Sequence, residues 1–206
     1  MKIIGRLTAP IMIFFIAEGY YHTRDVKKYI FRLFVFSIIS HFAYALAFDG
    51  DFIPFKKSIF DQTSVIWAFL MGLIALSIRK SKTLKIQMWQ KHIIIFIIIW
   101  LAFPANWSSP AALAVLYVGI NRGNFRKQML CLIICIALYS LIYALFLDII
   151  YGIMQMLIVL AIPLLYQYNG QRGKWKGMKW FFYIYYPLHL TILGLIRVFI
   201  LHKCIN

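Results

Sequence analysis

Long apolar runs alternate with short polar connections along the whole chain. Most runs approach the ~20 residues that a helix needs to cross a bilayer, although the fourth and fifth are shorter. The runs are Ile4–Tyr21, Tyr29–Phe48, Thr63–Ile78, His92–Phe103, Pro110–Ile120, Met129–Leu147, Tyr151–Tyr166 and Trp180–His202. We therefore expect an all-α, polytopic transmembrane helical bundle of about eight segments. No connection is long enough to separate domains, so residues 1–206 are expected to form a single integral membrane domain.

Composition supports a membrane protein and argues against nucleic-acid binding. Apolar residues make up 63% of the chain, well above the 45–50% typical of soluble domains. The formal net charge is +16, but the 22 Lys and Arg residues are grouped in short segments between apolar runs rather than along one basic face. The three cysteines show neither a metal-ligand nor a disulfide pattern, so no metal site is expected.

The distribution of cations between alternate connections predicts the topology. If all eight runs cross, one set of connections carries 16 Lys and Arg residues and the other side keeps six, together with Asp49, Asp51, Asp61 and Asp148. Cytoplasmic connections are enriched in Lys and Arg. We expect the basic connections to be cytoplasmic in a bacterial plasma membrane, with both ends of the given sequence outside.

The first apolar run ends in a carboxylate and an imidazole at helical spacing. Glu18 and His22 lie four residues apart, so on a helix they share one face. A carboxylate within a membrane helix is costly and often functional, and it can orient an imidazole for proton transfer. In the alternative interpretation Glu18 pairs with Arg6 or Arg24 as a structural bridge while His22 lies among the lipid headgroups.

Other polar positions are interpreted mainly as structural. His41 lies in the middle of the second run, where a hydrogen bond to a helix carbonyl accounts for it. In the connection before the fifth run, Asn106, Ser108 and Ser109 are expected to cap the following helix, with Pro110 in its first turn. The segment Asn121–Lys127 combines Gly and cations at a helix C-terminus, and it also suits a phosphate.

The segment Tyr168–Leu190 is the strongest candidate for a binding loop followed by a functional helix. Glycines alternate with Arg172, Lys174, Lys176 and Lys179, a combination that can wrap a phosphate-bearing ligand. An aromatic run then follows and contains His189, two residues after Pro187. An isolated His in a membrane helix is often only a packed residue, but the neighbouring tyrosines and the cationic loop favour a functional role.

These same residues resemble the TraX family of bacterial membrane proteins. The similarity covers nearly the whole chain in the same order, through the runs IIGRLTAPIMIFFIAEGYYHTRDVKKYIFRL, SVIWAFLMGL, NRGNFRKQM and YNGQRGKWKGMKWFFYIYYPLHL. The most specific elements are GR…P…EG…HTR…Y…RL and YNG…RG…FYIYYPLHL. The last helix is also similar to the closing helix of multi-pass acyltransferases, in which a Tyr-rich run ends in His.

The resemblance implies membrane-bound acetyl transfer with acetyl-CoA as donor, because the founding member is associated with N-acetylation of conjugative pilin. The positions that carry over are Glu18, His22, Arg24, Asn169, Gly170, Arg172, Pro187 and His189. Family members usually begin with another apolar helix that carries an Asp-His pair, and this sequence starts at Met1, just before the Ile-Gly-Arg run. One N-terminal helix of the family is therefore expected to be missing here.

We therefore expect a TraX-like acyltransferase that passes acetyl to an amine or hydroxyl of a peptide, pilin or envelope acceptor at the lipid bilayer. Its expected catalytic residues are Glu18, His22 and His189, which are expected to converge on one hollow, and its expected donor-binding residues are Arg24, Asn169, Gly170, Arg172 and Lys174. The alternatives are a non-enzymatic membrane accessory protein of conjugation or export, and a small transporter. A transporter is disfavoured by the short chain and by the lack of an internal repeat.

Overall fold

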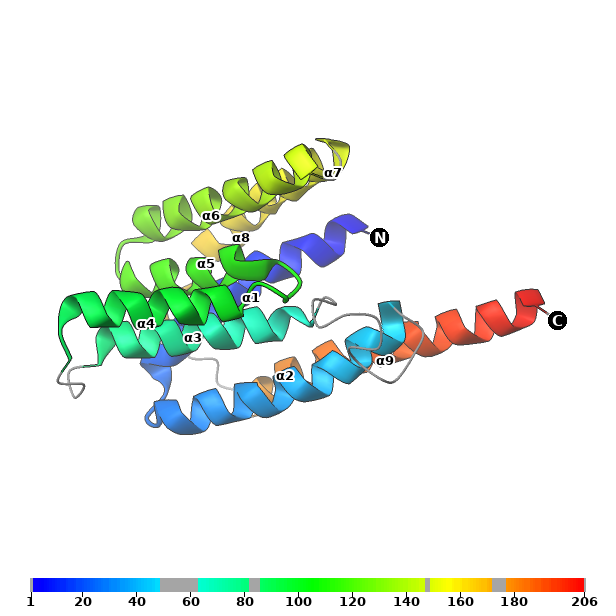
Figure 1. The fold of residues 1–206 in the computed structure, drawn as a ribbon, viewed down its shortest axis with the longest axis horizontal. Coiled ribbons are helices and arrows are strands. Elements are labelled where there is room, and N and C mark those ends of the chain that lie inside the picture. The colour runs from blue at the N-terminus through cyan, green and yellow to red at the C-terminus, as the bar shows by residue number, and fades with distance from the viewer. Residues whose placement is uncertain (1, 49–62, 82–85, 147–148, 172–176, 206) are drawn as a thin grey trace.

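The computed structural model describes residues 2–48, 63–81, 86–146, 149–171 and 177–205, and these residues are helical almost throughout (Figure 1). The predicted all-α fold class is confirmed. The helices are α1 (Lys2–His22), α2 (Val26–Phe48), α3 (Val65–Lys80), α4 (Met88–Leu101), α5 (Ser108–Ile120), α6 (Phe125–Phe146), α7 (Ile149–Gln155), the 3₁₀-helix η1 (Met156–Ala161), α8 (Ile162–Tyr166) and α9 (Met178–Ile205).

Within the described residues, the seventh apolar run is the one predicted segment that is not a single α-helix. Residues Met156–Ala161 form η1, which separates α7 from α8. Pro163 explains the break, because it has no N–H to donate to the carbonyl of Val159 and its ring would clash with that carbonyl in a continuous α-helix. The α-helix resumes with Pro163 in its first turn, where the missing N–H has no cost.

Helices α3 and α5 form the centre of the bundle. Ala68, Leu73 and Leu76 of α3 and Ala112 and Val115 of α5 are completely buried. The two helices approach closely at Gly72, where an added Cβ would lie 2.6 Å from the carbonyl oxygen of Ala112. Small residues allow such close helix packing in membranes, where dispersion contacts replace the hydrophobic effect as the driving force.

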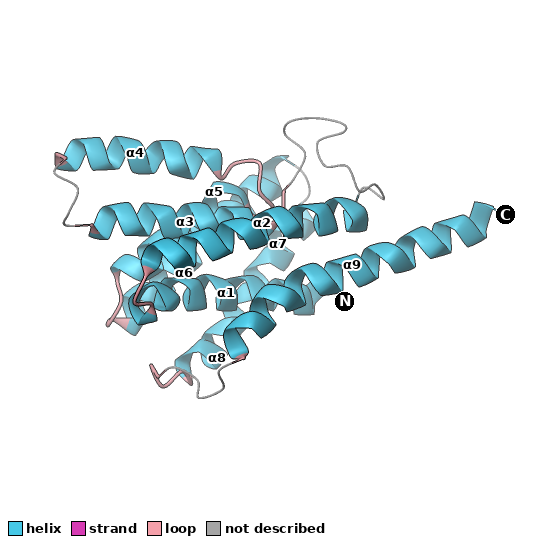
Figure 2. Ribbon diagram, turned by 90° about the horizontal axis from the view of Figure 1, so that it is seen from below, coloured by secondary structure: helices cyan, strands magenta, loops and turns pink. Residues whose placement is uncertain are grey.

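The helix ends that adjoin the basic connections lie together. The C-terminal ends of α1, α3 and α5 and the N-terminal ends of α2, α4 and α6 are all at the left in Figures 1 and 2. We call this the basic end of the bundle, because Arg24, Lys28, Lys80, Arg122 and Lys127 belong to it. The alternation of cations along the sequence is thus matched by an alternation of helix direction.

Helix α9 packs on α2 and runs parallel to it (Figure 2). Near the basic end the ring of Tyr183 stacks on Phe36 at 4.8 Å. Further along, Gly194 lies against Leu46 and Ala47, and the Arg197 guanidinium donates to the carbonyl of Ala47 at 2.9 Å. The C-terminal part of α9 extends beyond the other helices in both views.

Large apolar side chains cover much of the outside of the bundle. Phe31, Phe96, Trp100, Leu145 and Phe199 are each at least 66% exposed, far more apolar exposure than a soluble monomer shows. Among the described helices, Val26–Phe48 and the Phe125–Leu145 part of α6 are long and apolar enough to cross a membrane, and three shorter apolar helices accompany them. These features are consistent with a membrane protein, and the number of crossings stays a prediction.

The connection between α4 and α5 differs from the expected capping arrangement. Ser108 Oγ donates to the carbonyl of Phe103 and Ser109 Oγ donates to the carbonyl of Ile99, each at 2.9 Å. The residue before α5 is Trp107, in the left-handed region at φ 71°, and it makes no side-chain cap. The serine hydroxyls therefore satisfy the carbonyl groups at the end of α4 rather than the N–H groups of α5.

The turn between α1 and α2 provides the first testable prediction. Asp25 Oδ1 accepts the backbone N–H of Lys28 at 3.1 Å, and this bond, helped by the Lys28 ammonium, lowers the pKa of the Asp25 carboxyl below its ordinary value of 3.8. A lowered folded-state pKa means that the stabilisation is present above about pH 4 and is lost as the pH falls through the folded value.

Asp25→Asn keeps the cap but removes the titrating group. We expect the unfolding midpoint of the wild type to fall more than that of Asp25→Asn when the pH is lowered from about 5 to about 3. Thermal unfolding at the two pH values measures the midpoint of each protein. An equal fall in the two proteins would show that the Asp25 carboxylate does not contribute.

Candidate functional site

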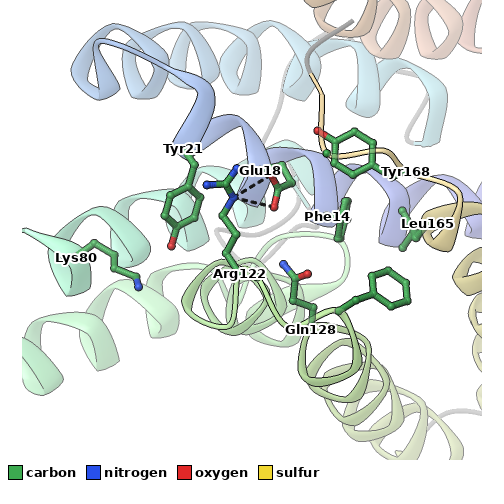
Figure 3. A pocket seen from close by; sticks show the side chains of 11 residues that line it. Phe14, Glu18, Tyr21, Lys80, Arg122, Gln128, Leu165 and Tyr168 are labelled. Carbon is green, nitrogen blue, oxygen red and sulfur yellow. Dashed lines mark hydrogen bonds and ion pairs between the residues drawn. The ribbon is translucent and has the colours of Figure 1, made fainter.

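A partly buried ion pair between Glu18 and Arg122 lies at the basic end of the bundle. Arg122 Nε is 3.2 Å from Glu18 Oε1 and 3.1 Å from Oε2, so one N–H is shared by both carboxylate oxygens (Figure 3). The Glu18 side chain is only 8% exposed and that of Arg122 is 37% exposed. The pair therefore joins a carboxylate inside the bundle to a cation at its edge, across 104 residues of sequence.

The turn between α5 and α6 brings Arg122 to this position. Helix α5 ends at Ile120, the side-chain amide of Asn121 donates to the carbonyl of Tyr117, and Gly123 adopts φ +94°. Glycine suits this position because side chains disfavour positive φ. The turn closes at Asn124, whose Oδ1 accepts the N–H of Lys127.

His22 makes the second contact with Glu18. Its Nε2 lies 3.4 Å from Glu18 Oε2, at the i, i+4 spacing that the sequence predicts. The imidazole side chain is 31% exposed as a whole, although its Nε2 is buried and has no hydrogen-bond partner. The expected Glu18–His22 contact is therefore present, and among the described side chains Arg122, rather than the expected Arg24, forms the ion pair with Glu18, whereas the side chain of Arg6 is not described.

Tyr21 fixes the end of α1 against α5. Its hydroxyl donates to the carbonyl of Gly119, and the Arg122 guanidinium lies 4.5 Å from the centre of its ring. A cation over an aromatic face is stabilised by the ring quadrupole. Arg122 is thus held by a carboxylate on one side and by an aromatic ring on the other.

A cavity of about 470 Å³ opens beside this ion pair. Its polar lining comes from Glu18, Tyr21, Lys80, Arg122 and Gln128, and the last of these is buried with its amide donating to the carbonyl of Val118. Its apolar lining comes from Phe14, Phe125, Leu165 and Tyr168 (Figure 3). The volume falls within the range of small-molecule sites, and one charged end with one apolar end is typical of them.

Comparison with known proteins identifies the family. The sequence profile described as "TraX protein" matches residues 1–197. The chain belongs to the TraX family. It is also similar to the probable fimbrial assembly protein FimC, serogroup H1, of Dichelobacter nodosus, with 27% identity over 207 residues, which cover 97% of this chain and 84% of that relative. No solved structure shows a significant match.

The loop after α8 contributes to the cavity of this TraX chain. Tyr168 and Gly170 line it, and Gly170 has φ +70°. Asn169 Oδ1 accepts the N–H of Gln171 at 3.0 Å and so folds the loop rather than facing the cavity. Partial burial, together with the negative charge of Glu18, raises the pKa of the Tyr168 hydroxyl, although Arg122 acts in the opposite direction. Its phenol is therefore neutral at pH 7.

The predicted donor-binding residues are only partly brought together. Gly170 lines the cavity, Asn169 is its neighbour, and Arg24 is exposed at the α1–α2 turn without lining the cavity. Arg172 and Lys174 lie outside the described residues. Their role as donor ligands stays a prediction.

His189 is not among the described residues that line the cavity, so the structure does not bring it to the cavity of Glu18. Its Nδ1 lies 3.0 Å from the carbonyl oxygen of Tyr185, and its ring stacks on that of Tyr185 at 5.3 Å. The lateral position of α9, which packs on α2, and the depth of each residue along its helix both contribute to the separation. Glu18 is one turn from the basic end of α1, whereas His189 is 11 residues into α9, about 16 Å from the start of that helix. A catalytic role of its own for His189 stays a prediction.

Sequence reasoning missed Lys80 and Arg122 as site residues. Lys80 is interpreted only as a topology signal, since a cation at the end of an apolar run usually has that role. Arg122 is interpreted only as part of the segment Asn121–Lys127, which suits both the topology and a phosphate, and not as a partner of Glu18. A signal for Arg122 was nevertheless present, because a carboxylate as deep as Glu18 requires a charged partner. What the sequence did not show was which of several cations at the same end would reach it.

Proposed function

We propose that this TraX protein is a membrane-bound acyltransferase that moves an acetyl group from acetyl-CoA to an amine or hydroxyl of a peptide, pilin or envelope acceptor. The proposal places it in the bacterial plasma membrane with the basic end in the cytoplasm, by the positive-inside rule. The observation that carries the proposal is a buried carboxylate, Glu18, on the wall of a cavity at the basic end. An ionisable residue inside a membrane bundle is costly, and such residues usually belong to functional sites.

The proposed reaction is direct transfer between donor and acceptor. The acceptor nitrogen or oxygen attacks the thioester carbonyl, and a C–N or C–O bond forms. The C–S bond then breaks, and the departing thiolate of coenzyme A takes up the proton that the acceptor gives away. Such a reaction needs a base beside the acceptor and a positive group beside the carbonyl oxygen, where negative charge develops.

Glu18, His22 and Arg122 can supply these functions within one small region. Glu18 accepts the proton of the acceptor, and His22, 3.4 Å away, relays it to the departing thiolate. Arg122 carries several further N–H groups besides the Nε that binds Glu18. These groups are proposed to stabilise the oxyanion, an effect that is strong where water is excluded.

The donor is proposed to enter from the cytoplasm through the loops at the basic end. Arg24, Asn169, Gly170, Arg172 and Lys174 are the proposed donor-binding residues, because cations and glycine-rich backbone suit a pyrophosphate. Gly170 supports this assignment by lining the cavity itself.

A non-enzymatic role in pilus assembly is the second candidate. It is supported by the name of the relative from Dichelobacter nodosus, which describes a probable fimbrial assembly protein. In that case the Glu18–Arg122 pair would serve only to hold α1 against the α5–α6 turn. Assembly would then need the folded protein but not the carboxylate.

The test is acetyl transfer by the purified chain in lipid nanodiscs, with acetyl-CoA labelled in the acetyl group and a peptide or pilin acceptor. We expect label in the acceptor, and the rate of His189→Gln measures whether His189, which lies outside the cavity, takes part in catalysis. Folded protein that transfers no label while still supporting pilus assembly in cells would favour the second candidate.

A further inference from the structure

Lys80 is a charged residue of the cavity that the proposed transfer step does not use. It is the last residue of α3, and its Nζ lies 6.0 Å from the centre of the Tyr21 ring (Figure 3). It lines the cavity opposite the apolar wall formed by Phe14 and Leu165. Its position therefore adds a second cation to the one supplied by Arg122.

The acids near this end are already engaged. Of the six acids in the sequence, Glu18 and Asp25 are the two within the described residues. Glu18 is bound by Arg122 and His22, and Asp25 pairs with Lys28. Within the described part of the chain, Lys80 therefore has no carboxylate at ion-pair distance, and the cavity keeps a net positive charge.

The mouth of the cavity leaves room for a bulky anion. Gly123 and Gly170 both line it with positive φ, and a Cβ at either position would meet nothing within 4 Å. Backbone turns of this kind, together with cations, are common at phosphate sites. Low-dielectric walls such as Phe14 and Leu165, which are 3% and 2% exposed, strengthen the field of the cations inside.

We propose that Lys80 binds a phosphate group in this cavity, for a phosphate ester whose apolar or aromatic part packs on Phe14, Leu165 and Tyr168, while Arg122 keeps its place beside Glu18. Two sources share this chemistry: coenzyme A and the headgroup of an anionic phospholipid. The choice of coenzyme A rests on the proposed function, whereas the phosphate site itself rests on the cavity and its charges. This phosphate site adds a cation of α3 to the donor-binding residues that the sequence predicts.

The test compares Lys80→Met with Lys127→Met as a matched control. Both changes remove one ammonium group at the basic end, but Lys127 does not line the cavity. Binding of labelled coenzyme A to the full chain in phosphatidylcholine nanodiscs is measured without any acceptor. We expect Lys80→Met to weaken binding about tenfold or more, Lys127→Met to bind like the wild type, and Lys80→Arg to restore most of the affinity.

A second arm identifies the source of the phosphate. If the site holds a lipid headgroup, coenzyme A will bind weakly to every form, while the wild type will retain phosphatidylglycerol in native mass spectrometry and Lys80→Met will lose it. The proposal is overturned if folded Lys80→Met binds both coenzyme A and phosphatidylglycerol as well as the wild type does. Neither arm requires acetyl transfer. Both binding measurements can therefore be interpreted even if the protein has no transferase activity.

Discussion

Glu18→Gln is expected to lower the rate of acetyl transfer at least about hundredfold, because removal of a positioned general base typically costs 10²–10⁴ in rate. Glutamine keeps the size of the side chain and one oxygen that Arg122 can bind, so the end of α1 should stay in place. The change removes the proton acceptor and the negative charge next to His22. Initial rates with labelled acetyl-CoA in nanodiscs measure the effect.

Asp25→Asn is the matched control for this experiment. It removes the other described carboxylate at the same end, three residues beyond His22, and Asp25 does not line the cavity. We expect it to transfer acetyl at the wild-type rate. If Glu18→Gln and Asp25→Asn are equally active and both are folded, Glu18 is a structural partner of Arg122 and not the base.

Gly72→Ala is expected to have the largest effect on stability. The new Cβ would lie 2.6 Å from the carbonyl oxygen of Ala112 and 2.7 Å from Val115 Cβ, so α3 and α5 must move apart. Overpacking of this kind costs about 1–3 kcal/mol, which corresponds to a fall in the unfolding midpoint on the order of 5 °C for a chain of this size. Binding of coenzyme A should weaken as well, because Lys80 ends α3 and Arg122 follows α5.

Val159→Ile is a suitable control, since it adds one methylene to a residue that is 44% exposed on the outside of the bundle. Its free energy of unfolding should match that of the wild type within about 0.5 kcal/mol. A Gly72→Ala protein as stable as this control would mean that α3 and α5 are not packed as closely as described.

Much of the fold followed from the sequence because its signals are local. Within the described residues every apolar run except the seventh is a single α-helix, and the boundaries at His22, Phe48 and Ile120 are close to those predicted. The alternation of cations also anticipated that the ends of α1, α3 and α5 would gather. The spacing of Glu18 and His22 sufficed to predict their contact, since an i, i+4 pair needs only a helix.

The features that could not be predicted depend on contacts between distant segments. Arg122 reaches Glu18 only because α5 packs between α1 and α6, and nothing in the sequence distinguished it from the other cations at the basic end. The separation of His189 from Glu18 depends on the lateral position of α9 and on the depth of each residue along its own helix. The 3₁₀ stretch before Pro163 was predictable in principle, and the length of the apolar run obscured it.

The most direct test of the central claim, that the Glu18–Arg122 cavity is the transfer site, is photo-crosslinking with a photoreactive acyl-CoA, followed by peptide mapping. The account predicts that label will appear in α1 around Phe14 and in the loop around Tyr168, and that excess coenzyme A will abolish it. Label concentrated on α9 around Tyr185–His189, with none on α1 or at Tyr168, would contradict it.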